Sequence, residues 1–324
     1  MKNIVSSDLK TILHSKRANI YYLEYCRVLV NGGRVEYVTD EGNQSLYWNI
    51  PIANTTSILL GTGTSVTQAA MRELSKAGVM VGFCGGGGTP LYSSTEGEFD
   101  ILWISPQSEY RPTEYLQSWF SLWLSDEKRL MGAKRLLQLR IDFIQKSWAR
   151  NSRTFDENFC FETPSLLSDL AQYRQEVQSA TTIMGIFSVE AHFTKQLYKM
   201  VCRAVDYHSF TRMKQGLGKD PANRNLDYGN YLAYGLGATA TWVLGLPHGL
   251  SILHGKTRRG GLVFDAADLI KDALVLPQAF ISAIQGHDDQ EFRMSCIRNF
   301  LNREALDYMI DSLKEIAQKQ GEYS

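Results

Sequence analysis

The spacing of apolar residues in this 324-residue chain changes near residue 105. Before that point, short β-rich runs alternate with turn residues, as in NIYYLEYCRVLVNGGRVEYVT (19–39). Beyond it, apolar residues recur at helical intervals. Strands followed by helices predict an α+β fold, with a small N-terminal β-rich domain over 1–105 and a larger all-α domain over 106–324. The helices are expected near 114–150, 163–180, 182–205, 225–245, 265–285 and 289–318.

Glycines mark the expected turns of the first domain. Gly32 and Gly33 separate two β-rich runs, a pattern typical of a hairpin. The stretch TSVTQAAMRELSKAG (64–78) predicts a helix with Thr64 or Ser65 as its N-cap and Gly78 as its stop. The runs GTGTSV (61–66) and CGGGGTP (84–90) lack the rest of a dinucleotide or phosphate-loop motif, so we interpret them as turns.

Composition excludes several classes of protein. Thirty-four basic and 34 acidic residues cancel, so any nucleic-acid surface must come from a local basic cluster. The five cysteines are scattered without a C-x-x-C pair, which favours a reducing compartment over a disulfide framework. No stretch approaches the length of a membrane span, and the first residues lack a signal-peptide core. We therefore expect a cytoplasmic protein with no membrane partner.

A glutamate interrupts an apolar stripe within 182–205. At about 100° per residue, Glu190 falls in the middle of that stripe. A buried carboxylate needs a cation, a metal or a proton, because desolvating an isolated charge is too costly. A structural ion pair in the core explains the residue equally well when it is considered alone. The apolar neighbours are Ile183, Ile186, Phe187, Phe193, Thr194, Leu197 and Val201.

Three aspartates share one face of the expected helix LVFDAADLIKDALVL (262–276). Asp265, Asp268 and Asp272 are spaced by three and four residues, and like charges at these spacings repel. A solvated acidic face relieved by Lys271 is one interpretation. A metal site is the other, because carboxylates at this spacing project together.

A histidine and a basic loop precede these aspartates. His254 ends the apolar run LSIL and could be a hydrogen-bonded core residue. Combined with Glu190 and the aspartates, it forms the mixed oxygen and imidazole set that suits Mn²⁺ and tolerates Mg²⁺. The following loop GKTRRGG (255–261) is either solvated or a phosphate contact, because its glycines permit close passage of a nucleic-acid backbone. Its cations are Lys256, Arg258 and Arg259.

Several segments together resemble one known family. They are LLGTGTSVTQAAMRELSKAGVMVGFCGGGGTPLY, GIFSVEAHFTKQLYK, DPANRNLDYGNYLAYG and LPHGLSILHGKTRRGGLVFDAADLIKD. They closely resemble the CRISPR-associated adaptation endonuclease and integrase, the Cas family numbered one, in its type I-F (Ypest) form, over essentially the whole chain. Many relatives carry glycine after the glutamate, where this chain has Ala191.

The resemblance implies a function and a set of site residues. It implies a metal-dependent DNA endonuclease and integrase that inserts captured DNA fragments into the CRISPR array. Glu190, His254 and Asp268 would hold Mg²⁺ or Mn²⁺, with Asp265 as a further active-site acid. Besides the loop cations, Arg224 and Lys271 are weaker candidates for DNA contacts.

The resemblance also implies an assembly. Two chains would form a homodimer largely through their β domains. Two such dimers would surround a small ferredoxin-like partner, which in this subtype is fused to the interference helicase and nuclease. The DNA would comprise the captured fragment and the repeat and leader of the array.

Two other functions remain open at this stage. A general metal-dependent repair nuclease acting on branched DNA would use the same ligands. A non-catalytic DNA-binding scaffold would tolerate replacement of Glu190 or Asp268, whereas either metal-dependent enzyme would not.

Overall fold

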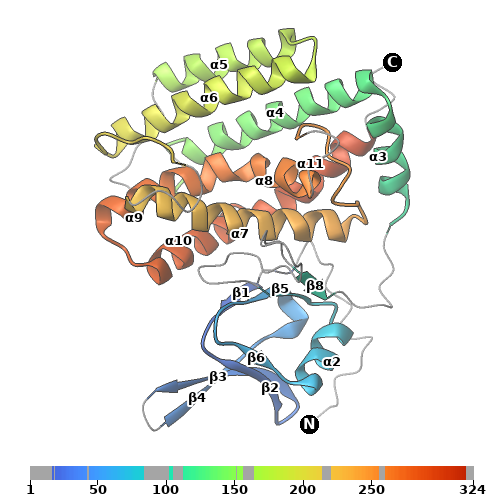
Figure 1. Cartoon of the computed structure of the whole chain (residues 1–324), viewed down its shortest axis with the longest axis vertical. Coiled ribbons are helices and arrows are strands. Elements are labelled where there is room, and N and C mark those ends of the chain that lie inside the picture. The colour runs from blue at the N-terminus through green and yellow to red at the C-terminus, as the bar shows by residue number, and fades with distance from the viewer. Residues whose placement is uncertain are drawn as a thin grey trace. The chain divides into compact units, whose positions relative to one another are not determined.

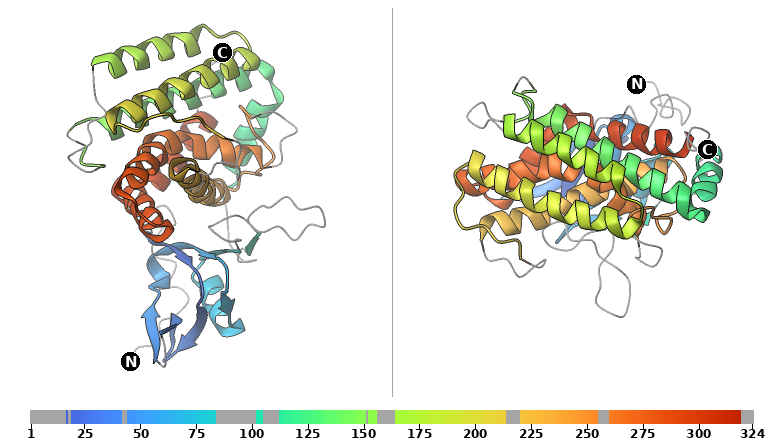
Figure 2. Two further views of the ribbon diagram at one scale, coloured as in Figure 1. Left: turned by 60° about the vertical axis from the view of Figure 1, so that its left-hand side comes forward. Right: turned by 90° about the horizontal axis from the view of Figure 1, so that it is seen from above.

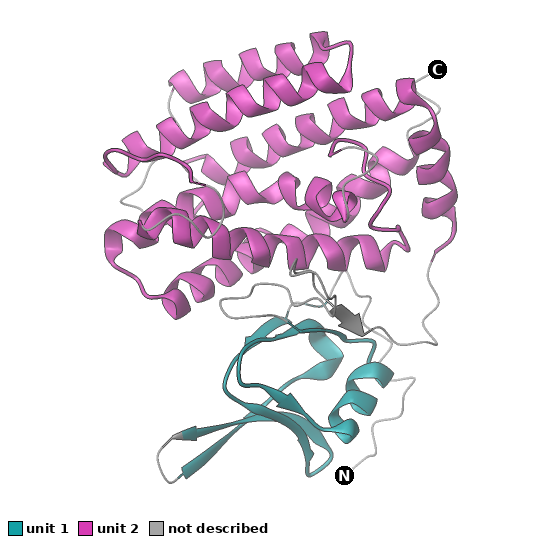
Figure 3. Ribbon diagram, in the orientation of Figure 1, with its two compact units in different colours: residues 1–110 teal, residues 111–324 magenta. Residues whose placement is uncertain are grey.

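The computed structural model confirms the α+β class. It describes residues 17, 19–41, 44–83, 102–104, 112–150, 152–155, 164–213, 220–254 and 260–318. The chain divides into two compact units, Met1–Tyr110 and Arg111–Ser324, coloured separately in Figure 3. Strands dominate the described part of the first unit and helices that of the second.

The first sheet of the N-terminal unit is mainly parallel. β1, β5 and β7 pair in parallel, and β8 pairs antiparallel with β7. Every residue of β5 is buried, as expected of a central strand covered on both faces. The sequence prediction of hairpins missed this sheet, because its strands pair across long connections. The strands are β1 (Asn19–Leu23), β5 (Thr55–Leu60), β7 (Met80–Phe83) and β8 (Leu102–Ile104).

The second sheet contains the predicted hairpin. β2 and β3 pair antiparallel across Gly32 and Gly33, whose φ angles of 54° and 80° are the positive values that a tight hairpin turn requires. β4 extends the sheet beyond β3, and the short β6 pairs in parallel with β2 (Figure 1). The strands are β2 (Arg27–Asn31), β3 (Arg34–Glu41), β4 (Gln44–Asn49) and β6 (Ser65–Val66).

The helix of this unit, α2 (Gln68–Lys76), begins later than predicted. Thr67 is its N-cap, and its side chain accepts a hydrogen bond from the Ala70 amide. The prediction of Thr64 or Ser65 was wrong because Ser65 pairs with β2 instead. Gly78, with φ 69°, ends the helix as predicted.

The C-terminal unit is helical throughout its regular elements. Three predicted segments are divided: 114–150 and 289–318 each form two helices, and 265–285 is interrupted by a π-helical turn. Ser125 begins a new helix by accepting from the Lys128 amide, and Glu304 at φ 49° separates the last two helices. The elements are α3 (Glu114–Leu124), α4 (Asp126–Trp148), α5 (Pro164–Ser179), α6 (Ile183–Ala204), α7 (Pro221–Val243), α8 (Gly261–Ile270), η4 (Lys271–Val275), α9 (Leu276–Gln285), α10 (Asp289–Asn302) and α11 (Ala305–Gln318).

Helix α7 lies against α8, η4 and α9 in the core of this unit, while α4, α5 and α6 run alongside one another (Figures 1 and 2). Two glycines permit this close packing. A Cβ at Gly237 would lie 2.6 Å from the Val263 carbonyl oxygen, and one at Gly229 would lie 2.4 Å from Val275 Cγ1. None of the described helices combines the length and apolarity needed to cross a bilayer.

Candidate active site

The segment that carries His254 is held in place by helix α3. The indole Nε1 of Trp119 donates to the Leu250 carbonyl at 2.8 Å, and that of Trp123 donates to the Ser251 carbonyl at 3.0 Å. These bonds join residues more than a hundred positions apart in the chain. They fix the backbone immediately before His254.

Asp265, on α8, is fully buried beneath this segment and binds it with both carboxylate oxygens. Its Oδ2 accepts from the Ser251 hydroxyl at 2.8 Å, the Ile252 amide at 2.7 Å and the Leu253 amide at 3.2 Å. Its Oδ1 accepts from the backbone amide of His254 at 3.1 Å and pairs with the ring Nδ1 at 2.7 Å. Asp265 therefore orients His254, a different role from that of an acid facing substrate.

The pairing with Asp265 determines the tautomer of His254. Because a carboxylate accepts at Nδ1, that nitrogen carries the proton of the neutral ring, and Nε2 then has the lone pair that a metal ligand needs. Nε2 lies 3.7 Å from Asp268 Oδ2, which is too long for a hydrogen bond. Burial lowers the pKa of His254, but the hydrogen bond to Asp265 and the charge of Asp268 outweigh it and raise the pKa overall.

Asp268, one turn further along α8, is a buried carboxylate with few partners. Neither oxygen has a hydrogen-bond partner among the described residues, although the Lys271 ammonium contacts Oδ1. Burial raises the pKa of Asp268, but the cations around it, Lys271 first, lower it overall. The same contact outweighs burial at Lys271 and raises its pKa above the usual range.

Glu190 on α6 is paired with Arg140 of α4, a residue that the sequence analysis did not identify. Arg140 is buried; its Nη1 donates to Glu190 Oε1 at 2.8 Å, and its Nε donates to Asp272 Oδ2 at 2.8 Å. Its Nη2 also donates to Thr194 Oγ1 at 3.1 Å. Asp272 and Glu190 both raise the pKa of Arg140 against the opposing effect of burial. The Glu190 side chain is 16% exposed, so it is less buried than predicted.

A signal for Arg140 was present in the sequence. Apolar residues lie four and three positions before it and three and four after it, the same stripe pattern that identified Glu190. The structure buries all four of them: Leu136, Leu137, Phe143 and Ile144.

A π-helical turn separates Asp272 from Asp265 and Asp268. The turn η4 follows Ile270, whose φ of −124° departs from helical geometry, and it places Asp272 toward α4. The solvated acidic face, one of the two interpretations of the sequence, was wrong, because Asp265, Asp268 and Asp272 are all buried. Each has different partners: the 251–254 segment, Lys271 and Arg140, respectively.

Helix α6 passes beside His254. The rings of Phe187 and His254 meet edge to face with centroids 6.1 Å apart, and Glu190 follows one turn later. Among the described residues, however, no three histidine, cysteine, aspartate or glutamate side chains are arranged to hold an ion as they stand. The structure thus brings two predicted ligands, His254 and Asp268, together and leaves the third, Glu190, on Arg140.

The donor chemistry of that pair fits a divalent ion. The site offers a buried carboxylate, Asp268, whose Oδ2 has no hydrogen-bond partner among the described residues. It also offers the Nε2 of His254, whose ring is oriented by the Asp265 carboxylate at Nδ1.

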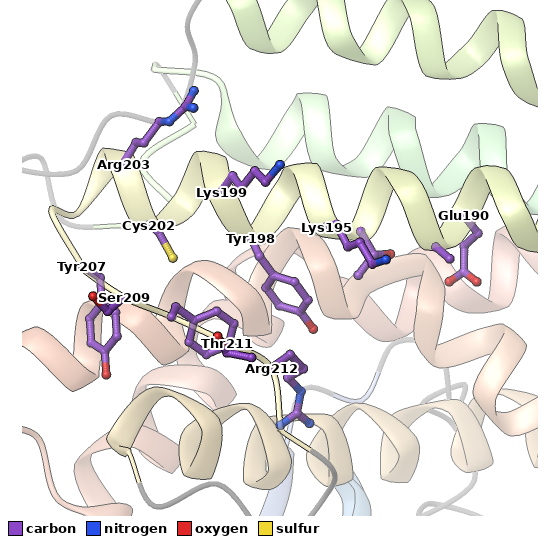
Figure 4. A pocket seen from close by; sticks show the side chains of 13 residues that line it. Glu190, Lys195, Tyr198, Lys199, Cys202, Arg203, Tyr207, Ser209, Thr211 and Arg212 are labelled. Carbon is purple, nitrogen blue, oxygen red and sulfur yellow. The ribbon is translucent and has the colours of Figure 1, made fainter.

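A cleft of about 860 Å³ runs along α6 from Glu190. Figure 4 shows Glu190 near one end of this stretch of α6, with Tyr198 pointing toward the segment that contains Arg212. Three cations of α6 are spaced by four residues and therefore lie on one side of the helix. None pairs with an acid in the described part of the chain. They are Lys195, Lys199 and Arg203.

The far wall of the cleft is tied to the start of α7. The buried Asn223 accepts from the Arg212 guanidinium at 2.8 Å and the Met213 amide at 3.0 Å, and donates to the Thr211 carbonyl at 2.9 Å. Arg212 also binds Asp227. Sequence reasoning missed this cleft because the path of the segment after α6 is fixed by Asn223 of α7, a contact that spacing along α6 does not reveal.

The predicted DNA-contact residues have different outcomes. Arg224 is exposed on α7 and pairs with Asp289 at 3.3 Å, and Lys271 is turned onto Asp268. The remaining three, Lys256, Arg258 and Arg259, lie outside the described residues.

Residues 23–315 match the family described as CRISPR associated protein Cas1. The chain belongs to the Cas1 family. It is 62% identical over 313 residues to the "CRISPR-associated endonuclease Cas1" of Pectobacterium atrosepticum, an alignment that covers 97% of this chain and 96% of the relative. The family resemblance seen in the sequence is thereby confirmed.

Two solved structures share the Cas1 fold. One is described as "Crystal structure of TtCas1-DNA complex", with a TM-score of 0.67, 20% identity and coverage of 93% of this chain and 92% of that one. The other is "Casposase bound to integration product", with a TM-score of 0.68, 14% identity and coverage of 93% and 91%. At these identities the likeness concerns the fold alone.

Proposed function

We propose that this Cas1-family protein is a divalent-metal-dependent DNA endonuclease and integrase that inserts captured DNA fragments into the CRISPR array of a type I-F system. One observation carries the proposal. The carboxylate of Asp265 leaves the Nε2 of His254 facing Asp268, a buried carboxylate whose Oδ1 contacts the Lys271 ammonium and whose Oδ2 has no hydrogen-bond partner among the described residues. A buried carboxylate oxygen without a partner beside an imidazole nitrogen suits a metal ligand.

The proposed ligands are His254, Asp268 and Glu190. Bound Mg²⁺ or Mn²⁺ would polarise a phosphoryl oxygen and stabilise charge on the departing oxygen. Asp265 keeps the imidazole in the tautomer that can bind the ion. Glu190 lies at the end of the cleft, where its carboxylate would exchange Arg140 for the ion.

The proposed reaction is a phosphoryl transfer between DNA strands. The 3′-hydroxyl oxygen of the captured fragment attacks a phosphorus atom at the edge of the repeat and loses its proton. The bond from that phosphorus to the 3′ oxygen of the repeat strand breaks, and the departing oxygen takes up a proton. One phosphodiester bond forms as one is lost, so the residues of the site have only to position the groups and stabilise charge.

The cleft supplies a surface for the DNA backbone. Lys195, Lys199 and Arg203 repeat at one turn of α6, about 6 Å apart along the helix axis. Such a row suits consecutive phosphates, and it begins at Lys195, five residues beyond Glu190. We include these cations with the loop residues Lys256, Arg258 and Arg259 as proposed backbone contacts. The TtCas1–DNA complex has the same fold, which supports DNA as the ligand of this one.

The proposed assembly follows from the family. We infer a homodimer formed through the β-rich unit, and a ferredoxin-like partner fused to the helicase and nuclease. Analytical ultracentrifugation tests the first inference, since a monomer at every concentration would contradict it.

The decisive experiment is strand joining by three variants. Glu190→Gln, His254→Ala and Asp268→Asn should each abolish integration of a supplied fragment into a supercoiled CRISPR array, with purified partner and Mn²⁺ present. Each variant should remain folded, with dimerisation and most DNA binding intact; Glu190→Gln and Asp268→Asn should lower the melting temperature, because each removes the acid that pairs with Arg140 or Lys271. A double replacement should be scarcely worse than either single one, because one lost ligand already leaves the ion unpositioned. Well-folded variants that retain near wild-type joining would refute the metal assignment.

The same assay separates the other two functions. A repair nuclease would cut branched DNA in a metal-dependent way but would not join the fragment to the array. A non-catalytic scaffold would show no loss with any of the three variants. The casposase with the same fold is bound to an integration product, which favours joining over cutting alone.

A further inference from the structure

Lys271 occupies an unusual position for a lysine. Its ammonium contacts Oδ1 of Asp268, whose side chain is 1% exposed, while the lysine side chain is 20% exposed. Two other lysines in the described part of the chain pair with an acid three residues earlier. The acids there are much more accessible, at 34% for Glu73 and 75% for Asp311. Only the Lys271 pair is therefore protected from the screening that makes surface ion pairs weak.

Asp268 depends on this cation. Its oxygens have no hydrogen bond among the described residues, and the nearest histidine nitrogen is 3.7 Å away. Arg140, whose charge also acts on Asp268, is bonded to Glu190 and Asp272. A buried carboxylate without a cation would be strongly destabilising. Among the cations that act on Asp268, Lys271 is therefore the one in direct contact with it.

We propose that Lys271 is the internal counter-cation of the metal site, neutralising Asp268 when no divalent ion is bound and competing with the ion for that carboxylate. The inference rests on the proposed function, in which Asp268 is a ligand. Two cations at one carboxylate repel each other strongly in a buried site. Lysine can leave, because its charge sits on a flexible four-carbon stem that is partly exposed. Ion binding therefore exchanges one cation for another.

The exchange predicts that removing the lysine charge strengthens ion binding. Lys271→Met keeps a long apolar stem and removes the competitor. We expect the metal-free variant to melt at a lower temperature than the wild type and to bind Mn²⁺ about tenfold more tightly, equivalent to about 1.4 kcal/mol. Lys314→Met is the matched control, because it breaks an i,i+3 pair with an exposed acid and should leave Mn²⁺ affinity unchanged.

The measurement is calorimetric titration of the full-length protein with MnCl₂, with melting curves recorded with and without the ion. The proposal would be overturned if Lys271→Met bound Mn²⁺ no more tightly than the wild type. It would also be overturned if the only effect of Lys271→Met were weaker DNA binding. If Lys271→Met is unfolded without metal, recovery of its circular dichroism spectrum in millimolar Mn²⁺ supports the proposal. If Lys271→Met stays unfolded in Mn²⁺ while the double variant Lys271→Met/Asp268→Asn folds, the proposal is overturned.

The Asp268→Asn variant distinguishes the two levels of failure. If wild type and Asp268→Asn respond to Mn²⁺ identically, the proposed metal site itself is refuted and the counter-cation with it. If Asp268→Asn loses a response that wild type and Lys271→Met share equally, the metal site stands and only the role of Lys271 fails.

Discussion

Replacing Asp265 by asparagine should uncouple the orientation of His254 from the rest of the fold. The carboxylate accepts five hydrogen bonds, three at Oδ2 and two at Oδ1. Asparagine has a single acceptor oxygen, and its NH₂ group takes the place of the other carboxylate oxygen. That NH₂ group faces either the two donors of His254 or the three donors of residues 251–253, depending on the orientation of the amide. At least two hydrogen bonds to a charged group are therefore lost.

The magnitude follows from that count. A hydrogen bond to a charged group contributes about 1.5–3 kcal/mol, so losing two predicts a decrease of about 3–6 kcal/mol in the free energy of unfolding. If the amide NH₂ faces His254, the ring must change tautomer and protonate Nε2, which then cannot bind an ion. Mn²⁺ affinity should then fall about 10- to 100-fold, as is typical when the carboxylate behind a metal-binding histidine is lost.

Urea unfolding of the metal-free protein and calorimetric titration with MnCl₂ measure the two effects separately. Asp311→Asn, which alters an exposed acid of α11, is the control and should change neither quantity measurably. An Asp265→Asn variant with a free energy of unfolding within about 1 kcal/mol of the wild type would refute the hydrogen-bond reasoning, since that is less than one such bond. Unchanged Mn²⁺ affinity would refute the orienting role.

Three further predictions concern the surrounding charges. Because folding raises the pKa of His254, protonation of this residue stabilises the folded protein; the contribution is complete below the unfolded pKa of about 6.5 and is lost as the pH rises through the higher folded pKa. The free energy of unfolding, measured with urea in the presence of EDTA, should show this loss in the wild type but not in His254→Gln. Arg140→Met should lower the free energy of unfolding by about 3–5 kcal/mol, because it leaves buried carboxylates unpaired. Lys146→Met, exposed on the same helix, should not lower it, and equal free energies of unfolding for the two variants would contradict the role of Arg140 in pairing buried acids. Lys195→Glu combined with Lys199→Glu should weaken DNA binding and reduce the slope of log affinity against log salt by about two, and an unchanged slope in salt titrations would exclude these cations from the interface.

The local pattern of the sequence predicted the elements of the helical unit well. Apolar stripes at helical spacing identified α5 and α6 nearly to their ends, because burial of one face is a local property of spacing. Helix junctions were less well predicted. Ser125 and Glu304 interrupt continuous periodic patterns through a cap and a positive φ, and neither changes the hydrophobic spacing around it.

The first sheet illustrates a different limit. The β2–β3 hairpin was predictable because the tight turn at Gly32 and Gly33 brings two strands that are adjacent in the chain side by side. The pairing of β1 with β5 joins segments separated by β2, β3 and β4. Strand propensity carries no information about a partner so far away in the chain.

The candidate site, too, has features that the sequence predicts and features that only the tertiary structure decides. The sequence by itself determined which residues had to be chemically exceptional: a glutamate in an apolar stripe, a histidine after an apolar run, and aspartates at helical spacing. Tertiary structure alone decided how their charges are compensated. Asp265 binds the 251–254 segment, Asp268 meets Lys271, and Arg140 from α4 joins Glu190 to Asp272. The physical reason is that spacing along one helix reports only which side chains are buried together, whereas charge balance depends on cations and amides delivered by other elements through packing.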